Sequence, residues 1–257
     1  MSFRFASLGS GSRGNATLVQ AGETSVLVDC GFAARELAAR CEGLGFDPAA
    51  LSAILVTHEH GDHTRGVGAV ARRFGIPVWT SHGTWRASKC GEIAELNLFA
   101  GHEGDFRIGD LLVTPVPVPH DAREPMQFVF TRDRLRLGLL TDLGSITPRV
   151  LQALDGLDAL LLECNHDPEL LANGPYPPSL QARVGGCYGH LNNAQAADFL
   201  RRIDYGRLRH LVAGHLSEKN NAPELARMAL ESVSADLGDC LSLLIQDRAS
   251  DWFAIAS

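Results

Sequence analysis

The chain has 257 residues, of which 45% are hydrophobic and 21% charged, and its formal net charge at pH 7 is −7. This composition is typical of a globular protein with a sizeable core, and six scattered cysteines without a Cys-X-X-Cys pair exclude a disulfide framework or a zinc ribbon. The negative charge argues against a broadly basic surface for nucleic acid, but a phosphodiester substrate stays possible for a site that binds its own cations.

The start of the chain lacks the apolar core and cleavage site of a signal peptide, and no apolar run approaches the ~18 residues of a membrane helix. We therefore expect a cytoplasmic protein that does not contact membranes. The sequence does not indicate an oligomeric state.

The first elements are predicted to be strands, over residues 3–8, 16–19 and 25–29. The loop at 9–15 lacks the Gly-Lys-Ser/Thr of a nucleotide P-loop, so we interpret it as a turn, with phosphate contact as the alternative. Asp29 ends the third strand, where a carboxylate usually caps the strand end. A helix is expected over 33–44, and Asp47-Pro48 is a helix start signal.

The next strand, 54–56, runs into a dense group of metal-ligand residue types. His58, His60, Asp62 and His63 fall within six positions, although the whole chain has only ten histidines. Imidazole and carboxylate are common ligands of divalent metals, and side chains at a strand end can converge without sharing a helix face. His58 and His60 can serve one metal, with Asp62 and His63 serving a neighbour. A polar turn that contains histidine by chance is the weaker interpretation.

Further elements are predicted along the rest of the chain. They are a helix at 64–74, a strand at 76–80, a strand at 111–118 that its prolines place at a sheet edge or bend, a hairpin at 127–131 and 135–140, a helix at 147–154, a strand at 157–162, a helix at 194–203, a strand at 208–213, a helix at 225–233 and a terminal hairpin at 240–245 and 252–255. With no linker or low-complexity stretch, residues 1–257 are predicted to form a single domain.

The His-X-His-X-Asp-His pattern after a strand resembles the signature of the metallo-β-lactamase superfamily. The resemblance implies a mixed α/β fold, the four-layer αββα sandwich, with a one- or two-metal hydrolytic site on one rim. It implies further ligands at His120, Asp142 and His215, each of which follows a predicted strand. It also implies that Asp29 orients the metal loop. A simple turn aspartate is the alternative for Asp142.

One branch of that superfamily matches more of the sequence. Ser-Gly-Ser-X-Gly-Asn, Thr-His-Glu-His-X-Asp-His, His-Asp-Ala-X-Glu-Pro, Thr-Asp-Leu-Gly, Glu-Cys-Asn-His-Asp and the two Gly-His-Leu loops together resemble the YycJ (WalJ) family. That family consists of cytoplasmic bacterial enzymes associated with 5′-to-3′ degradation of DNA. Cys164 departs from the small residue, such as Ser, that we expect there. The likeness spans residues 5–221.

The resemblance implies hydrolysis of a phosphodiester by two divalent metal ions (zinc, manganese or iron) and a bridging hydroxide. One metal would take His58, His60 and His120, the other Asp62, His63 and His215, with Asp142 bridging. We predict catalytic roles for Asp62 and for His190, which precedes a helix whose N–H groups can receive an anion. A loop histidine bonded to a carbonyl is the alternative for His190. The predicted substrate contacts are Ser10, Ser12, Asn15, Asn192, Asn193 and Asn220, and loop stabilisation is the alternative for each.

DNA is the favoured substrate over RNA. A cyclic phosphodiesterase or an RNA-processing nuclease is the enzymatic alternative. A regulatory protein that binds metal without catalysis is the alternative from another class. A lactamase is disfavoured, because the late loops show no recognisable lactamase pattern.

Overall fold

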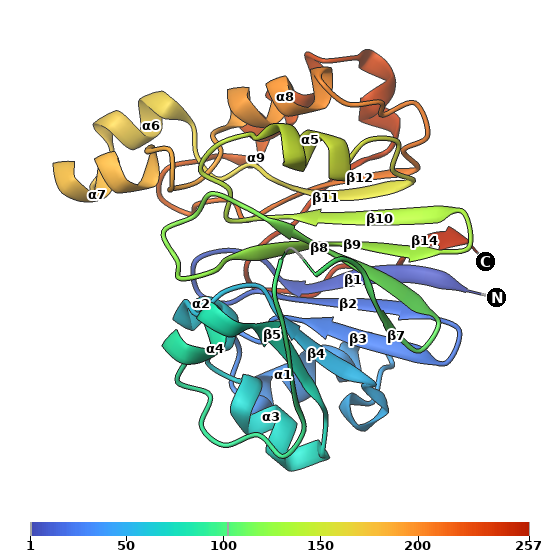
Figure 1. Ribbon diagram of the computed structural model, residues 1–257. Coiled ribbons are helices and arrows are strands. Elements are labelled where there is room, and N and C mark those ends of the chain that lie inside the picture. The colour runs from blue at the N-terminus through green and yellow to red at the C-terminus, as the bar shows by residue number, and fades with distance from the viewer. Residues whose placement is uncertain (1, 102, 257) are drawn as a thin grey trace.

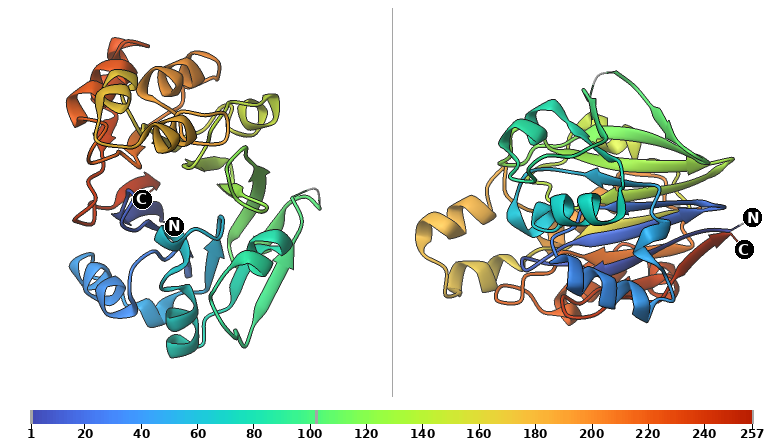
Figure 2. Two further views of the ribbon diagram at one scale, coloured as in Figure 1. Left: turned by 90° about the vertical axis from the view of Figure 1, so that its left-hand side faces the viewer. Right: turned by 90° about the horizontal axis from the view of Figure 1, so that it is seen from below.

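Two sheets packed face to face form the centre of the computed structural model, which describes residues 2–101 and 103–256 (Figures 1 and 2). The first sheet has the strand order β14-β1-β2-β3-β4-β5-β6, with β1 Phe3–Gly9, β2 Ala16–Ala21, β3 Thr24–Val28, β4 Ala53–Val56, β5 Val78–Ser81, β6 Leu96–Phe99 and β14 Phe253–Ala256. The second has the order β13-β12-β11-β10-β9-β8-β7, with β7 Phe106–Ile108, β8 Leu111–Pro117, β9 Met126–Arg132, β10 Leu135–Leu140, β11 Ala159–Glu163, β12 His210–Gly214 and β13 Leu241–Leu243.

Helices cover the outer face of each sheet, as Figure 1 shows. On the first sheet lie α1 Ala34–Gly43, α2 Gly61–Thr64, α3 Val67–Phe74 and α4 His82–Ala87, with a 3₁₀ turn at Pro48–Ala50. On the second lie α5 Pro148–Ala153, α8 Asn193–Arg201 and α9 Pro223–Glu231, with a 3₁₀ turn at Ala235–Asp239. Two short helices, α6 Pro168–Asn173 and α7 Pro178–Val184, project at the left of Figure 1. The predicted αββα sandwich is confirmed.

Three apolar cores hold these four layers together. The central core lies between the sheets and includes the fully buried rings of Phe3, Phe5, Phe128 and Phe130. Each such ring stabilises the fold by roughly 1.5–3 kcal/mol relative to an exposed one. The two outer cores join each sheet to its helices. Among the described residues, no helix has the length and apolar character to cross a membrane.

The strand directions decide where functional loops gather. Strands β3 to β6 pair in parallel in the first sheet, and β10 to β13 pair in parallel in the second. The carboxyl ends of parallel strands meet at one edge of a sheet, and ligand sites form in the loops that follow them. The polar residues predicted after the ends of β3, β4, β10 and β12 therefore come to one rim of the sandwich.

Some predicted elements differ from the structure. The helix start at Asp47 gives only a 3₁₀ turn. The predicted helix 64–74 begins later, as α3 at Val67, and Thr64 ends the separate helix α2. Gly66 lies between them, where a Cβ would be 1.9 Å from the carbonyl oxygen of Phe32. The terminal hairpin is wrong, since β13 pairs with β12 while β14 pairs with β1 in the other sheet.

The proline-rich strand β8 is not an outermost strand, because it lies between β7 and β9. However, β7 pairs only with Leu111, Leu112 and Val113, so the proline-containing half has a neighbour on one side only. A proline has no backbone N–H to donate, and on an unpaired side there is no neighbouring strand to receive one. Helices α6 and α7 were not predicted, because they lack an apolar stripe: α6 buries only Leu171, and α7 buries no residue.

Candidate metal centre

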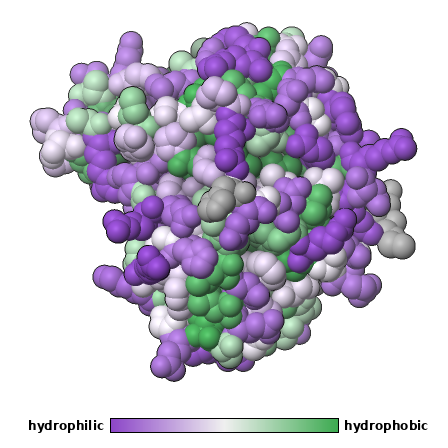
Figure 3. All heavy atoms as spheres, in the orientation of Figure 1, coloured by the Kyte–Doolittle hydropathy of each residue, from purple (hydrophilic) through white to green (hydrophobic). Residues whose placement is uncertain are grey.

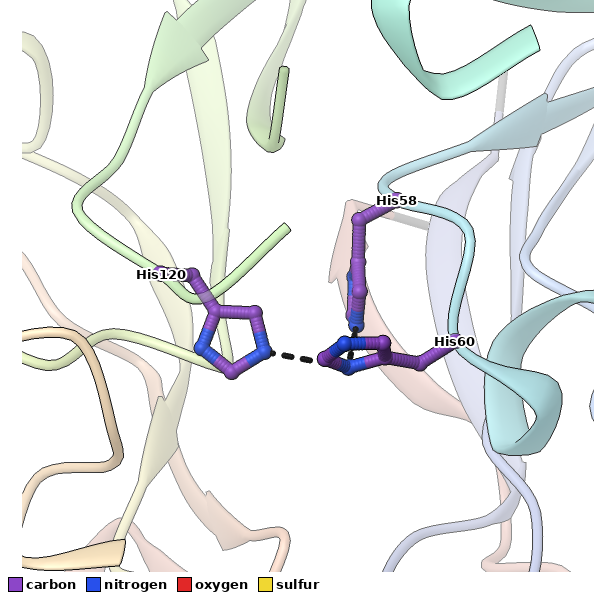
Figure 4. Close-up of side chains that lie close together, drawn as sticks. All are labelled: His58, His60 and His120. Carbon is purple, nitrogen blue, oxygen red and sulfur yellow. Dashed lines mark hydrogen bonds between the residues drawn. The ribbon is translucent and has the colours of Figure 1, made fainter. Parts of the chain in front are cut away.

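The first cluster on the rim consists of three histidines (Figure 4). His58 and His60 come from the loop between β4 and α2, and His120 follows β8. Nε2 of His58 lies 3.1 Å from Nδ1 of His60, and Nε2 of His120 lies 3.3 Å from the same atom. Burial lowers the pKa of His58 and of His120, so both rings are held neutral, the form that binds a metal.

A second cluster lies beside the first and contains Asp62, His63 and His215, whose ligand atoms are within 4.8 Å of one another. Asp142 lies between the two clusters. Its Oδ2 is 3.3 Å from Nε2 of His63, and its Oδ1 is 3.9 Å from Nε2 of His120. The structure thus brings all seven predicted ligands together, in the grouping that the sequence analysis gave.

The charge of this region is set by buried carboxylates among imidazoles. Burial alone would raise the pKa of Asp142, but His215 and His63 hold it well below its usual range. Burial would lower the pKa of His215, but Asp142, Asp62 and Glu163 raise it to about 10. A cluster of anionic oxygens beside neutral and proton-bearing rings is suited to cations, which would replace the protons.

The donor set fits divalent metal ions. Oδ2 of Asp142 and Nε2 of His215 are buried and have no hydrogen-bond partner among the described residues. A buried polar atom left unpaired costs about 1–3 kcal/mol, so these two atoms need a further partner. A cation coordinated by nitrogen and oxygen supplies one for both atoms. The metallo-β-lactamase fold implies divalent metal ions, and the residues present here fit them.

Asp29 supports the metal loop from behind. Its Oδ2 lies 2.8 Å from Nδ1 of His63 and accepts the hydroxyl of Thr57 at 2.8 Å, while its Oδ1 accepts the backbone N–H of Thr57 at 2.8 Å. These bonds leave Nε2 of His63 directed at the cluster. A partner on the far ring nitrogen fixes both the orientation and the tautomer of a ligand histidine.

The sequence analysis missed Glu163, at the end of β11. This carboxylate is fully buried, and its Oε1 lies 2.9 Å from Nδ1 of His190 and 2.8 Å from Nδ1 of His215. Three backbone N–H groups also donate to it, those of Asp142, Leu143 and Leu191. Burial would raise the pKa of Glu163, but His190 and the other donors lower it to about 2, so the group is ionised. Two signals were available: its position at a strand end, and its place as the first residue of the Glu-Cys-Asn-His-Asp motif.

Three ligand-region residues have unusual backbone conformations. Asp29, Asp142 and His215 have φ values of 60°, 52° and 56°, in the left-handed region that L-residues rarely adopt. Asp29 and His215 directly follow β3 and β12, and Asp142 is the second residue after β10. The left-handed turn reverses the chain at the rim and points each side chain back over the sheet end. Such strain commonly accumulates at functional sites.

A cavity of about 350 Å³ opens above the clusters. Of the six predicted substrate contacts, only Ser12 lines it. Helix α7 contributes Leu180, Arg183 and Val184 to its wall. Arg183 forms an ion pair with Asp121, and its side chain is 59% exposed. Arg183 was missed because nothing in the sequence links α7 to the metal loop.

The other five predicted substrate contacts make hydrogen bonds within the protein, which favours the alternative of loop stabilisation. Asn220 is wholly buried, and its side chain bonds to Ser217. Asn192 caps α8 in a capping box, and Asn193 pairs with Asn221. The other two are also buried: Ser10 accepts the N–H of His215 at 2.8 Å, and Asn15 accepts the N–H of Gly11 at 2.8 Å. Phosphate contact and loop capping use the same residue types, so sequence alone did not separate them.

An αββα sandwich with these clusters on one rim defines a metallo-β-lactamase-fold hydrolase. Residues 24–215 match the family model described as "Beta-lactamase superfamily domain", and the chain belongs to that superfamily. Within it, the chain is 36% identical to exodeoxyribonuclease YycJ of Bacillus anthracis over 93% of this chain and 91% of that protein. It is 32% identical to exodeoxyribonuclease WalJ of Streptococcus pneumoniae over 97% and 95%. The chain is therefore a member of the YycJ/WalJ family.

A solved structure agrees on the fold. The metallo-β-lactamase fold protein YhfI from Bacillus subtilis superposes with a TM-score of 0.74 over 98% of this chain and 100% of that one, at 16% identity.

Proposed function

We propose that this protein is a metal-dependent phosphodiesterase that degrades DNA from its 5′ end. One observation carries the proposal: the seven side chains expected to bind metal converge on one rim in a chain that is 36% identical to an exodeoxyribonuclease over most of its length. Family membership gives the kind of reaction, and the assembled rim gives the means to perform it. The polarity and the choice of DNA over RNA belong to the proposal.

Two divalent ions, zinc, manganese or iron, would occupy the two clusters. His58, His60 and His120 would hold one, and Asp62, His63 and His215 the other, with Asp142 shared. When bound, such ions lower the pKa of water and polarise phosphoryl oxygens. Asp62 is the ligand with the most exposed side chain of its cluster, at 23%, and it lines the cavity.

His190 is proposed as the proton donor to the leaving oxygen. Glu163 binds its Nδ1, so Nε2 carries the proton that can be transferred. Burial would lower the pKa of His190, but the carboxylates of Glu163 and Asp142 raise it above its usual value, which favours the proton-bearing ring. In degradation from the 5′ end, the leaving atom is the 3′ oxygen of the terminal nucleotide. That nucleotide would therefore lie on the His190 side of the site.

Two groups in the cavity can position the phosphate. Arg183 uses Nε for Asp121, which leaves its two terminal nitrogens for an oxyanion. Ser12, from the loop between β1 and β2, faces the same cavity. Neither residue touches the buried carboxylates, so both can bind a phosphate oxygen without disturbing the metal ligands.

The test is hydrolysis of end-labelled DNA by the metal-loaded protein. We expect mononucleotide release from linear strands labelled at the 5′ end and no degradation of a closed circular strand of the same sequence. An RNA strand of that sequence and a small diester, bis-p-nitrophenyl phosphate, complete the substrate set. Equal rates on circular and linear DNA would reject the exonuclease assignment, and faster release from RNA would favour the RNA-processing alternative. No hydrolysis of any diester would leave the non-catalytic alternative.

A further inference from the structure

A second cavity, of about 470 Å³, adjoins the metal centre on the side of the first sheet. Its lining comes from the metal loop, α2 and the segment after α4, and consists of Glu59, His60, Gly61, Thr64, Arg65, Ala87 and Lys89. We call it the α2–α4 groove. His60 and Gly61 line both this groove and the cavity above the clusters, so the two hollows meet at the metal centre.

Four cations border the groove, and none has a carboxylate partner. Arg65 and Lys89 line it, Arg86 lies on α4, and the Arg123 side chain packs against Gly83 of the same helix. All four are exposed. Within the described part of the chain, none lies within 4.0 Å of an acidic group, whereas arginines elsewhere on the surface do form such pairs. Arg65 donates one hydrogen bond, to the carbonyl of Arg13.

The acidic groups on this face are bound to the backbone instead. Oε1 of Glu59 accepts the N–H of Arg123 at 2.7 Å, and Oε2 of Glu124 accepts the N–H of Gly83 at 2.6 Å. These carboxylates therefore fix the loops and leave the cations free. The groove lining holds two cations, Arg65 and Lys89, against one carboxylate, Glu59, so its formal charge is positive in a chain with a net charge of −7. Such a groove attracts a polyanion.

The groove adjoins the first cluster at His60, whereas His190 adjoins it at His120. The His120 ring is 5.0 Å from that of His60, which borders the groove, and 5.2 Å from that of His190. His60 belongs to the first half of the chain, with α2 and α4, and His190 to the second half, next to α8. In Figure 1, α2 and α4 lie at the left ends of the strands of the first sheet, while α8 lies over the second sheet. A strand crossing the metal centre from the His190 side therefore continues into the groove.

We propose that the α2–α4 groove carries the phosphates of the retained DNA strand, with Arg65 and Lys89 pairing with backbone oxygens. The direction rests on the proposed function, in which the terminal nucleotide leaves on the His190 side. Contacts of this kind carry no base specificity, and they make binding depend on salt. Each nucleotide removed would bring the next phosphate to the metal centre while the groove holds the strand.

The first test is a binding measurement with the Arg65→Gln/Lys89→Gln double variant. Both proteins carry His190→Ala to slow hydrolysis, and a fluorescent 12-nucleotide DNA strand is titrated by anisotropy at several salt concentrations. Loss of two phosphate contacts lowers the slope of log Kd against log salt by about 1.4. If the two proteins bind equally at 1 M salt, the variant then binds about 25-fold more weakly at 0.1 M salt. The control is Arg202→Gln/Arg227→Gln, which removes the same charge from two exposed i,i+4 ion pairs on α8 and α9.

We expect the control variant to keep the wild-type slope and all variants to keep the wild-type melting temperature. An unchanged slope in the Arg65/Lys89 variant would overturn the proposal, as would an equal loss in the control. This measurement records binding alone. If the wild type binds DNA with the expected slope but hydrolyses none, the proposed function fails and the groove assignment stands.

The second test places the contacts along the strand. Uncharged methylphosphonate linkages are introduced at the second and third positions from the 5′ end. These neutral linkages should weaken DNA binding by the protein with an intact groove about as much as the double substitution does. In the Arg65/Lys89 variant they should cause no further loss of affinity. The variant should also lose most of the gain in kcat/KM that the wild type shows when the strand is lengthened from two to eight nucleotides. Equal weakening of both proteins by the neutral linkages, or a full length gain in the variant, would contradict the proposal.

Discussion

Replacement of Glu163 by Gln tests whether this buried carboxylate holds the rim together. Its two oxygens accept five bonds: three at Oε1, from Asp142, His190 and His215, and two at Oε2, from Leu143 and Leu191. An amide has one acceptor oxygen. With that oxygen at the Oε1 position, the new NH₂ group faces two backbone N–H donors.

Each N–H left without an acceptor costs about 1–3 kcal/mol, so Glu163→Gln should lower the free energy of unfolding by roughly 2–6 kcal/mol. That is a large part of the 5–15 kcal/mol typical of a domain. The measurement is urea unfolding of metal-free protein, which keeps metal affinity out of the comparison. The control is Glu231→Gln, which breaks an exposed i,i+4 ion pair with Arg227 and should change stability by less than ~0.5 kcal/mol. A Glu163→Gln protein as stable as the control would refute this account of the rim.

Three further predictions concern the metals, the proton donor and a buried histidine. Metal analysis after gentle purification should find about two divalent ions per chain, and His60→Ala or Asp142→Ala should abolish hydrolysis in a folded protein; full activity after chelation and desalting would contradict this. His190→Ala should lower turnover on DNA by about 10²–10⁴-fold, with a smaller loss for a nitrophenolate leaving group, and unchanged kinetics would remove His190 from the mechanism. His166 is buried, which lowers its pKa to about 4, so the unfolded chain binds this proton first as the pH falls below 6.5. The stability that it contributes is present above pH 6.5 and lost down to pH 4. His166→Asn should reduce the stability loss over that window by about 3 kcal/mol in unfolding titrations of metal-free protein; an identical loss in both proteins would rule this out.

The local part of the site was readable from the sequence, because four ligands fall within six positions after a strand. The distant ligands His120, Asp142 and His215 came from the family resemblance, since only the fold brings them to the same rim. Glu163 begins the Glu-Cys-Asn-His-Asp motif, but the resemblance assigned it no ligand role, so it was passed over. Its histidine partners lie 27 and 52 residues later, and only the fold shows that it contacts them.

The fold itself was predictable wherever apolar periodicity decided it. Most strands followed from short β-rich runs, and α3 from its apolar stripe, whereas β6 and β7 were missed and the two-sheet arrangement came from the family resemblance. The terminal segments were misread because two adjacent apolar runs look alike whether they pair with each other or with different sheets. In the structure β14 pairs with β1 at the edge of the first sheet, and β13 pairs with β12 at the edge of the second.

The left-handed residues after β3, β10 and β12 put stability and catalysis in opposition. Each such conformation costs an L-residue about 1–2 kcal/mol, and glycine would adopt it freely. In a library selected for heat resistance alone, with no demand for hydrolysis, positions 142 and 215 should drift toward glycine. Asp29 should persist, because its contacts with Thr57 and His63 offset the cost of its backbone conformation. In a library selected for DNA degradation all three positions should stay fixed, and compensating substitutions should accumulate in the cores. Positions 142 and 215 would then show which pressure a population had experienced.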